Sequence, residues 1–191
     1  MTVKADPVIL EAVLKQVEIA LAGSVLRPVI IGLCGAQGSG KTTLAAEVLE
    51  ECQSRGLRGA VLSIDDLYLA HAERQDLARK VHPLLATRGV PGTHDVRLGL
   101  SVVAGLRKGE EAPLPRFDKG RDDPVPRSGW PLSPAYCEVL LFEGWCVGAR
   151  PQETAALAEP VNALELEEDP EARWRTYAMP RLPDCTRCFS G

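Results

Sequence analysis

The sequence predicts a three-layer α/β sandwich with a mostly parallel sheet, built as one domain over residues 1–191. Three short apolar runs carry this prediction, because continuous apolar runs are typical of strands that are buried on both faces. Segments with helical spacing separate the runs, and strands that alternate with helices favour parallel pairing. At 191 residues the chain is long enough for one domain with a substantial core and too short for two.

Residues 1–24 are expected to contain an N-terminal helix that leads into the first strand. Asp6 is a typical N-cap, and Pro7 suits the first helical position. Apolar residues recur at helical spacing as far as Gly23: Ile9, Leu10, Val13, Leu14, Val17 and Leu21. The apolar run Pro28–Cys34 then predicts the first buried strand.

The rest of the chain predicts two further strands and two further helices. A glycine-rich turn leads from the first strand into a helix from Lys41 to about Ser54. Ala60–Ile64 predicts the second strand and Glu138–Phe142 the third. Another helix follows His94 and Asp95, and its apolar residues are Val96, Leu100, Val103 and Leu106.

Residues 107–136 form a proline-rich segment of a different character. Prolines stand at positions 113, 115, 124, 126, 131 and 134, with charged residues between them. This spacing excludes a helix and a central strand, because proline removes a backbone donor. Long ordered loops in small domains often carry function. We therefore expect a substrate loop here.

Charge and hydropathy exclude several classes of protein. The chain has 22 Lys and Arg against 26 Asp and Glu, a net charge of −4, whereas bulk nucleic-acid binding needs a basic surface. No apolar stretch is long enough to span a membrane, and the first residues lack the pattern of a secretory signal. We expect a cytoplasmic protein without nucleic-acid or membrane partners; the sequence leaves its oligomeric state open.

A complete phosphate-binding motif follows the first strand. The run from Gly35 to Thr42 matches G-x-x-x-x-G-K-[ST] at every position. In such a P-loop the backbone amides and the helix N-terminus face the phosphates, the lysine reaches the β- and γ-phosphates, and the Thr42 hydroxyl ligates Mg²⁺. The expected ATP-binding residues are Gly35, Ala36, Gln37, Gly38, Ser39, Gly40, Lys41, Thr42 and Thr43. The fold class is therefore a P-loop NTPase sandwich.

Two carboxylates at strand ends are candidates for the chemistry. Asp65 ends the second strand, whose carboxyl end should lie beside the P-loop, and it is placed to accept a proton from an attacking hydroxyl. The alternative is that Asp65 or Asp66 only caps the next helix. Glu143 ends the third strand and is expected, with Thr42, to serve Mg²⁺. The chain has no N/T-K-x-D motif, which argues against a regulatory GTPase.

The P-loop, the run Asp65–Tyr68 and the run Phe142–Trp145 together resemble the phosphoribulokinase, uridine kinase and pantothenate kinase superfamily. Three other segments make the chain most similar to the D-glycerate 3-kinase branch: Arg88–Asp95, Leu114–Lys119 and Pro160–Glu165. The resemblance implies a kinase that uses ATP and Mg²⁺ to phosphorylate a hydroxyl of a small metabolite, with Asp65 and Lys41 as catalytic residues. It implies acceptor contacts from Asp66, Tyr68, Arg88, His94, Lys119 and Arg121.

Several of these candidates have plainer explanations. His94 and Asp95 would simply cap the following helix, and Lys119 to Arg121 would be a solvated loop. Trp145 is expected to pack against the protein rather than to stack on adenine. The basic residue at Arg121 is also displaced from the Gly-Asp-Arg run that the resembled family often has.

The C-terminal part departs further from the resembled family. Relatives continue past a motif like Trp174–Tyr177 with a helix, a core strand and a basic lid, whereas residues 178–191 predict an irregular tail. We therefore expect a truncated or frame-shifted kinase that lacks its last strand and lid. The leading hypothesis is a kinase for D-glycerate. The alternatives are a non-catalytic ATP-binding protein and a kinase of the pantothenate or uridine type.

Overall fold

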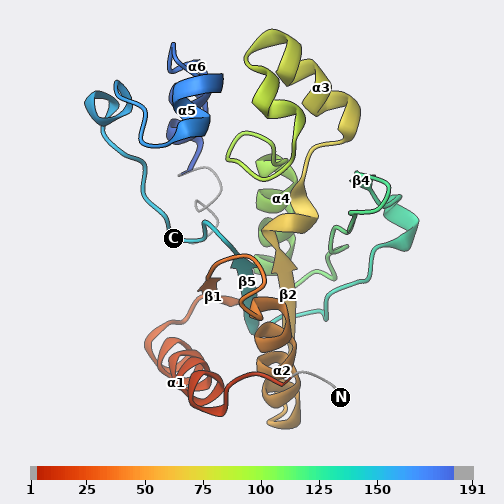
Figure 1. The fold of residues 1–191 in the computed structure, drawn as a ribbon. Helices are drawn as coiled ribbons and strands as arrows, with labels where there is room; N and C mark the ends of the chain where they lie inside the picture. The colour runs from red at the N-terminus through yellow and green to blue at the C-terminus, as the bar shows by residue number, and fades with distance from the viewer. Residues whose placement is uncertain (1–3, 183–191) are drawn as a thin grey trace.

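The computed structural model describes residues 4–182 and has the expected three-layer α/β arrangement (Figure 1). Its parallel sheet has the order β1-β5-β2 over the described residues. The strands are β1 (Val29–Cys34), β5 (Val139–Gly144) and β2 (Gly59–Ser63). In register, Leu141 of β5 lies opposite Ile31 on one side and Val61 on the other. Every residue of β5 is buried, so this strand forms the centre of the sheet.

Helices and short turns connect these strands. The α-helices are α1 (Pro7–Gly23), α2 (Lys41–Ser54), α3 (His71–Lys80), α4 (Val96–Arg107), α5 (Ala163–Glu168) and α6 (Arg173–Ala178). The 3-10 turns are Ile64–Leu67, Pro83–Ala86, Arg127–Gly129, Thr154–Leu157 and Met179–Arg181. The predictions for α1, α2 and α4 are confirmed. The sequence did not single out α3, because its side chains are mostly polar and Arg74 is its one buried residue.

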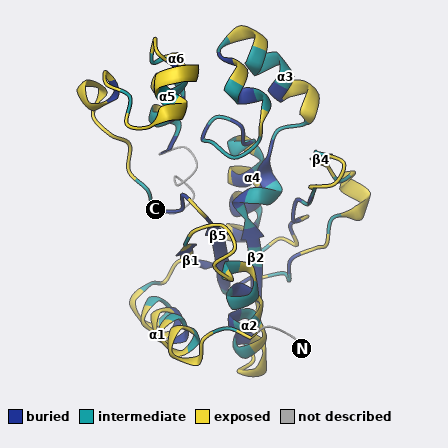
Figure 2. Ribbon diagram, in the orientation of Figure 1, coloured by how far each residue is buried: buried dark blue, intermediate teal, exposed yellow. Residues whose placement is uncertain are grey.

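The apolar core lies on both faces of the sheet. Leu140 and Phe142 of β5 belong to the cluster that includes α4, whereas Val139 and Leu141 belong to the cluster that includes α1 and α2. This alternation follows from the two-residue period of a strand. Figure 2 shows the buried sheet between helices whose outer surfaces are exposed. The continuous apolar run of β5 is thus explained by burial on both faces.

Two details of the sequence prediction need correction. Leu100 was expected on the apolar face of α4, but it is 38% exposed, and Val102 is buried in its place. Ile64, expected as the last residue of β2, begins a 3-10 turn. The sequence made no prediction of the strand order. In the structure β5, the last of the three strands in sequence, lies between β1 and β2.

The proline-rich segment 107–136 is an ordered loop, as expected. The amide of Leu114 donates to the carbonyl of Pro131 at 2.8 Å, and the amide of Ser133 donates to the carbonyl of Ala112 at 2.9 Å, so the two ends of the loop are joined. Its middle contains a small antiparallel hairpin that the sequence did not predict. The hairpin strands are β3 (Phe117–Asp118) and β4 (Asp123–Pro124).

The expected irregular tail, residues 178–191, is described as far as Leu182, and this part is helical, because Ala178 ends α6 and Met179–Arg181 form a 3-10 turn. Leu182 is buried in the α4 cluster. The rest of that prediction lies outside the described residues. Among residues 4–182, no helix combines the length and the apolar character that crossing a bilayer requires.

Replacing Leu106 with alanine is expected to destabilise the protein far more than replacing Leu100. Both residues lie on α4, but Leu106 is 1% exposed and Leu100 is 38% exposed. Leu106→Ala should lower the free energy of unfolding by about 2–5 kcal/mol, because it leaves a cavity. Leu100→Ala should change it by no more than about 0.5 kcal/mol. Urea unfolding of both variants measures the difference, and equal losses would contradict this placement of α4.

Candidate functional site

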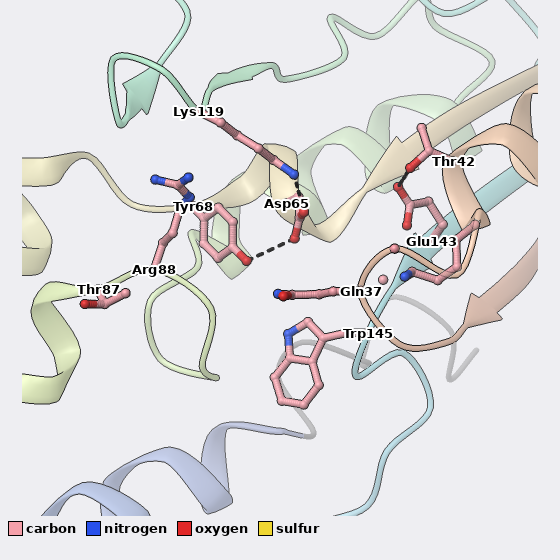
Figure 3. A pocket seen from close by; sticks show the side chains of 12 residues that line it. Gln37, Thr42, Asp65, Tyr68, Thr87, Arg88, Lys119, Glu143 and Trp145 are labelled. Atoms are coloured by element: carbon pink, nitrogen blue, oxygen red, sulfur yellow. Dashed lines mark hydrogen bonds and ion pairs between the residues drawn. The ribbon is translucent and has the colours of Figure 1, made fainter. Parts of the chain in front are cut away.

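A cavity of about 550 Å³ lies at the carboxyl ends of the three parallel strands (Figure 3). This is where open α/β sheets bind their ligands. Its walls come from the P-loop, the end of β2, the end of β5, the segment before α4 and the proline-rich loop. The lining residues are Gln37, Gly38, Lys41, Thr42, Asp65, Tyr68, Thr87, Arg88, Lys119, Glu143, Gly144 and Trp145.

The P-loop forms one side of this cavity. Gly38 and Gly40 have φ angles of 74° and 84°, a left-handed conformation that glycine adopts without strain. The helix α2 begins at Lys41, so its N-terminal amides follow the loop directly. The Lys41 ammonium donates to the carbonyl of Ala36 at 2.8 Å. The arrangement provides positive charge and backbone donors for an anion.

The nine residues expected to bind ATP are divided by the structure into two groups. Four line the cavity: Gln37, Gly38, Lys41 and Thr42. The other five form the turn and the start of α2 without lining the cavity: Gly35, Ala36, Ser39, Gly40 and Thr43. Gly35 has a packing reason to be glycine, because an added Cβ would lie 2.9 Å from the Ser39 hydroxyl.

Thr42 and Glu143 are joined by a hydrogen bond. The Thr42 hydroxyl donates to the Glu143 carboxylate at 3.1 Å, although their elements are far apart in sequence. Glu143 is 5% exposed, at the end of the central strand. Among the described residues, no group of three or more His, Cys, Asp or Glu side chains could hold a metal by itself. A hydroxyl and a carboxylate beside a P-loop do fit Mg²⁺, which takes one or two protein oxygens and completes its shell with phosphate and water.

Asp65 projects into the cavity from the turn after β2. Its carboxylate accepts two hydrogen bonds, from the Tyr68 hydroxyl at 2.9 Å and from the Lys119 ammonium at 2.6 Å (Figure 3). Burial acts to raise the pKa of Asp65, but the bonds from Lys119 and Tyr68 outweigh it, and the pKa lies below its usual value. The same burial, together with the charge of Asp65, raises the pKa of Tyr68. Asp65 is therefore an ionised carboxylate, and Tyr68 is a neutral donor.

The helix-capping alternative for the two aspartates does not hold. The residue before α3 is Ala70, and the 3-10 turn is capped by Ser63, whose hydroxyl accepts from the amide of Asp65. The structure also places Asp66 differently from the prediction, because this side chain does not line the cavity. Its carboxylate accepts from the amide of Phe117 at 3.0 Å and from the Arg116 guanidinium at 3.3 Å. Asp66 thus anchors the proline-rich loop.

His94 is another candidate for acceptor binding that the structure places elsewhere. It is 6% exposed, does not line the cavity, and stacks on the Tyr68 ring with 4.5 Å between centroids. Burial lowers the pKa of His94 to about 4, so the ring is neutral at pH 7. Asp95 caps α4 through the amide of Leu98 at 3.0 Å, which was the plainer explanation for this pair.

The remaining candidates are divided between the cavity and the surface. Arg88 and Lys119 both line the cavity. Arg121 is exposed and is not among the lining residues; its amide donates to Asp118 at 3.1 Å. Trp145 lines the cavity and also packs, since its indole donates to the carbonyl of Gly89 at 2.9 Å. Sequence reasoning missed Thr87 as a lining residue, although it directly precedes the segment Arg88–Asp95, which carries part of the family resemblance.

Comparison with known sequences finds kinases. The chain is 38% identical over 141 residues to an uncharacterized kinase, mug58, of Schizosaccharomyces pombe, a match that covers 69% of this chain and 51% of the relative. It is 36% identical over 140 residues to a chloroplastic D-glycerate 3-kinase of Arabidopsis thaliana, covering 68% of this chain and 30% of that protein. The chain thus spans about half or less of the length of these relatives. The sequence matches no protein-family model.

Solved structures share the fold. A D-glycerate 3-kinase from Cryptococcus neoformans superposes with a TM-score of 0.77 at 24% identity, over 94% of this chain and 69% of that one. A possible uridine kinase from Bacillus stearothermophilus has a TM-score of 0.51 at 20% identity, over 73% of this chain and 71% of that one. At these identities the superpositions establish the fold alone.

The low pKa of His94 predicts how acid affects stability. Between pH 6.5, its ordinary pKa, and about 4, the unfolded chain binds a proton that the folded chain does not. The contribution of His94 to the free energy of unfolding is therefore constant above pH 6.5 and decreases by about 1.4 kcal/mol for each pH unit below it. Urea unfolding from pH 7 to about pH 4.5 measures this decrease. His94→Phe, which retains a ring against Tyr68, should show a smaller decrease, and an identical pH dependence in both proteins would contradict the prediction.

Proposed function

Because the chain is homologous to small-molecule kinases and has the P-loop kinase fold, we propose that it transfers the γ-phosphoryl group of ATP to a hydroxyl of a small acidic metabolite, with D-glycerate as the first candidate. One observation carries the proposal: a P-loop lysine and an ionised aspartate line the same cavity. The two groups serve opposite sides of a phosphoryl transfer, since one holds the donor and the other receives the proton of the acceptor.

Asp65 is the proposed general base. The acceptor hydroxyl donates to the Asp65 carboxylate and loses its proton to it as the acceptor oxygen bonds to the γ-phosphorus. The bond between that phosphorus and the oxygen bridging to the β-phosphate breaks, and ADP leaves with the electron pair. The contacts from Tyr68 and Lys119 use one position on each carboxylate oxygen. Each oxygen has a second lone pair, so the acceptor hydroxyl still has a place to bind.

The P-loop side is proposed to hold the nucleotide. Lys41 and the amides at the start of α2 offer positive charge to the phosphates. Thr42 and Glu143, which are hydrogen-bonded to each other, would hold Mg²⁺ at the same place. When bound, Mg²⁺ neutralises charge on the phosphate oxygens.

Two cations support an acidic acceptor. Arg88 and Lys119 line the cavity on the side of Asp65, away from the P-loop. A guanidinium presents paired donors that match a carboxylate, so Arg88 is suited to bind the acid group of the acceptor. The name of the relative from Arabidopsis thaliana, which matches at 36% identity, makes D-glycerate the first acid to try.

The decisive experiment is an assay of ADP release from Mg·ATP with D-glycerate, pantothenate, uridine or no acceptor. Wild-type protein should release ADP with D-glycerate, and Lys41→Ala should not, because it removes the charge that holds the β- and γ-phosphates. Release with pantothenate or uridine would assign the alternative kinase types. ATP binding without release for any of the three acceptors would refute D-glycerate as the acceptor and support the non-catalytic alternative.

Asp65→Asn should separate binding from chemistry. The amide keeps the shape of the side chain but cannot take up the proton, so the kcat should decrease by roughly 10²–10⁴-fold, the usual contribution of a general base. The dissociation constant for ATP should stay within about twofold, since Asp65 is placed on the acceptor side. Asp76→Asn, which removes a carboxylate on the surface of α3, is the control and should behave as wild type. Loss of ATP binding in step with the loss of turnover would exclude Asp65 as the base.

A further inference from the structure

The hairpin in the proline-rich loop places Lys119 and Asp122 in one tight turn. Strand β3 pairs with β4, with Asp118 opposite Asp123, so residues 119–122 form the connection between them. The Asp118 carboxylate closes this connection by accepting from the amides of Gly120 at 2.9 Å and Arg121 at 3.1 Å. Lys119 stands at the first position of the turn and Asp122 at the last. A movement of one is therefore coupled to a movement of the other.

The Asp122 carboxylate contacts three basic side chains. One oxygen accepts from the Arg74 guanidinium at 2.8 Å and lies 2.9 Å from Nδ1 of His71. The other oxygen accepts from the Arg88 guanidinium. Although burial acts to raise the pKa of Asp122, the bonds from Arg74, His71 and Arg88 hold it far below its usual value. The residue has a φ of 59°, a left-handed conformation that aspartate tolerates better than most residues.

Among the three basic side chains that contact Asp122, Arg74 is held in place by burial and hydrogen bonds. Its side chain is 1% exposed in α3 and donates to three backbone carbonyls, of Leu69 at 3.1 Å, Ala86 at 3.0 Å and Asp122 at 2.9 Å. These three carbonyls belong to the segment before α3, the segment after it and the hairpin. A buried guanidinium with this many partners has one orientation, so it provides a rigid reference for the hairpin.

We propose that Asp122 is a positioning residue for the phosphoryl transfer, which holds Arg88 and, through the hairpin turn, Lys119 in place beside Asp65. This inference rests on the proposed function, because it assigns Asp122 to the acceptor half of that site. Asp122 itself does not line the cavity, whereas both residues that it positions do. It therefore acts through them and does not touch the acceptor.

Electrostatics explains why one carboxylate has this effect. Arg74 and Arg88 both contact Asp122, and both guanidinium groups lie near the Phe117 ring, at 6.0 Å and 5.8 Å from its centroid. Without the negative charge, two cations of like sign would be held close together with nothing between them, which is unfavourable. Arg74 is buried and fixed, so Arg88 would move, and the hairpin would be held to Arg74 by the Asp122 carbonyl alone. Lys119 would then be displaced from the 2.6 Å contact that it makes with Asp65.

Asp122→Asn tests the effect on the reaction. We expect the kcat/KM for the acceptor to decrease roughly 10- to 100-fold, the usual cost of a misplaced binding group, while the KM for ATP stays unchanged. Asp76→Asn is the matched control, because Asp76 pairs with Lys80 and Arg79 on α3 outside the cavity, and it should have no effect. Asp122→Glu retains the charge one methylene further out and should lose less than Asp122→Asn. If Asp122→Asn does not fold, Asp122→Glu takes its place in the test.

A double-mutant cycle separates positioning from general stability. If Asp122 acts through Arg88, Asp122→Asn should reduce the kcat/KM for the acceptor far less in a protein that already carries Arg88→Gln. Equal losses in both backgrounds would overturn the link to Arg88.

The reactivity of Lys119 gives a readout that does not depend on activity. The ion pair with Asp65 should slow acetylation of Lys119 by acetic anhydride relative to Lys108, an exposed lysine that forms no ion pair with residues 4–182. In Asp122→Asn the acetylation rate of Lys119, followed by mass spectrometry, should rise severalfold while that of Lys108 stays constant. An unchanged rate would overturn the positioning role. The two proposals can fail separately. If Lys119 is acetylated faster in Asp122→Asn but the wild-type protein phosphorylates no acceptor, the positioning of Lys119 stands and only the proposed function is refuted.

Discussion

The burial of β5 determines how the rest of the molecule is arranged. All six of its residues are buried, and both of its edges are paired, so its backbone donors and acceptors are used in two parallel ladders. Parallel ladders align the carboxyl ends of their strands. The P-loop after β1, Asp65 after β2 and Glu143 at the end of β5 therefore come together, and Thr42 reaches Glu143 across 3.1 Å. A frame buried on both faces gives these groups little freedom to move apart.

The side of the cavity that Arg88 and Lys119 line is held together in a different way. Arg88 lies in a segment between helices and Lys119 in the turn of the β3–β4 hairpin, outside the parallel sheet. Charge pairs and hydrogen bonds hold these segments instead, since Asp66 anchors the start of the hairpin, Asp65 pairs with Lys119, and Asp122 joins the hairpin to α3. Because these pairs are partly open to solvent, this half of the site is the more adaptable one.

Prediction from sequence succeeded where a residue's role depends on its near neighbours. The P-loop, the three strands and the helices α1, α2 and α4 follow from spacing, apolar runs and caps, and Asp95 caps α4 as its position indicated. It failed where the environment is set by distant segments. The sequence could not show that His94 stacks under Tyr68 and loses its charge, or that Asp66 turns away from the cavity to bind Phe117. Leu100 fits the helical period, yet it lies at the surface.

The P-loop side of the cavity can be predicted from the sequence alone, because it is a glycine-rich loop between a buried strand and a helix, with Lys41 and Thr42 at the start of that helix. The order β1-β5-β2 and the choice among the basic residues of the loops emerge only when the chain is folded. Arg88 and Lys119 line the cavity, whereas Arg121, one residue before Asp122, is exposed. The two halves differ because a phosphate cradle is a contiguous motif, whereas the charge and direction of a loop side chain depend on partners that the fold brings from elsewhere in the chain.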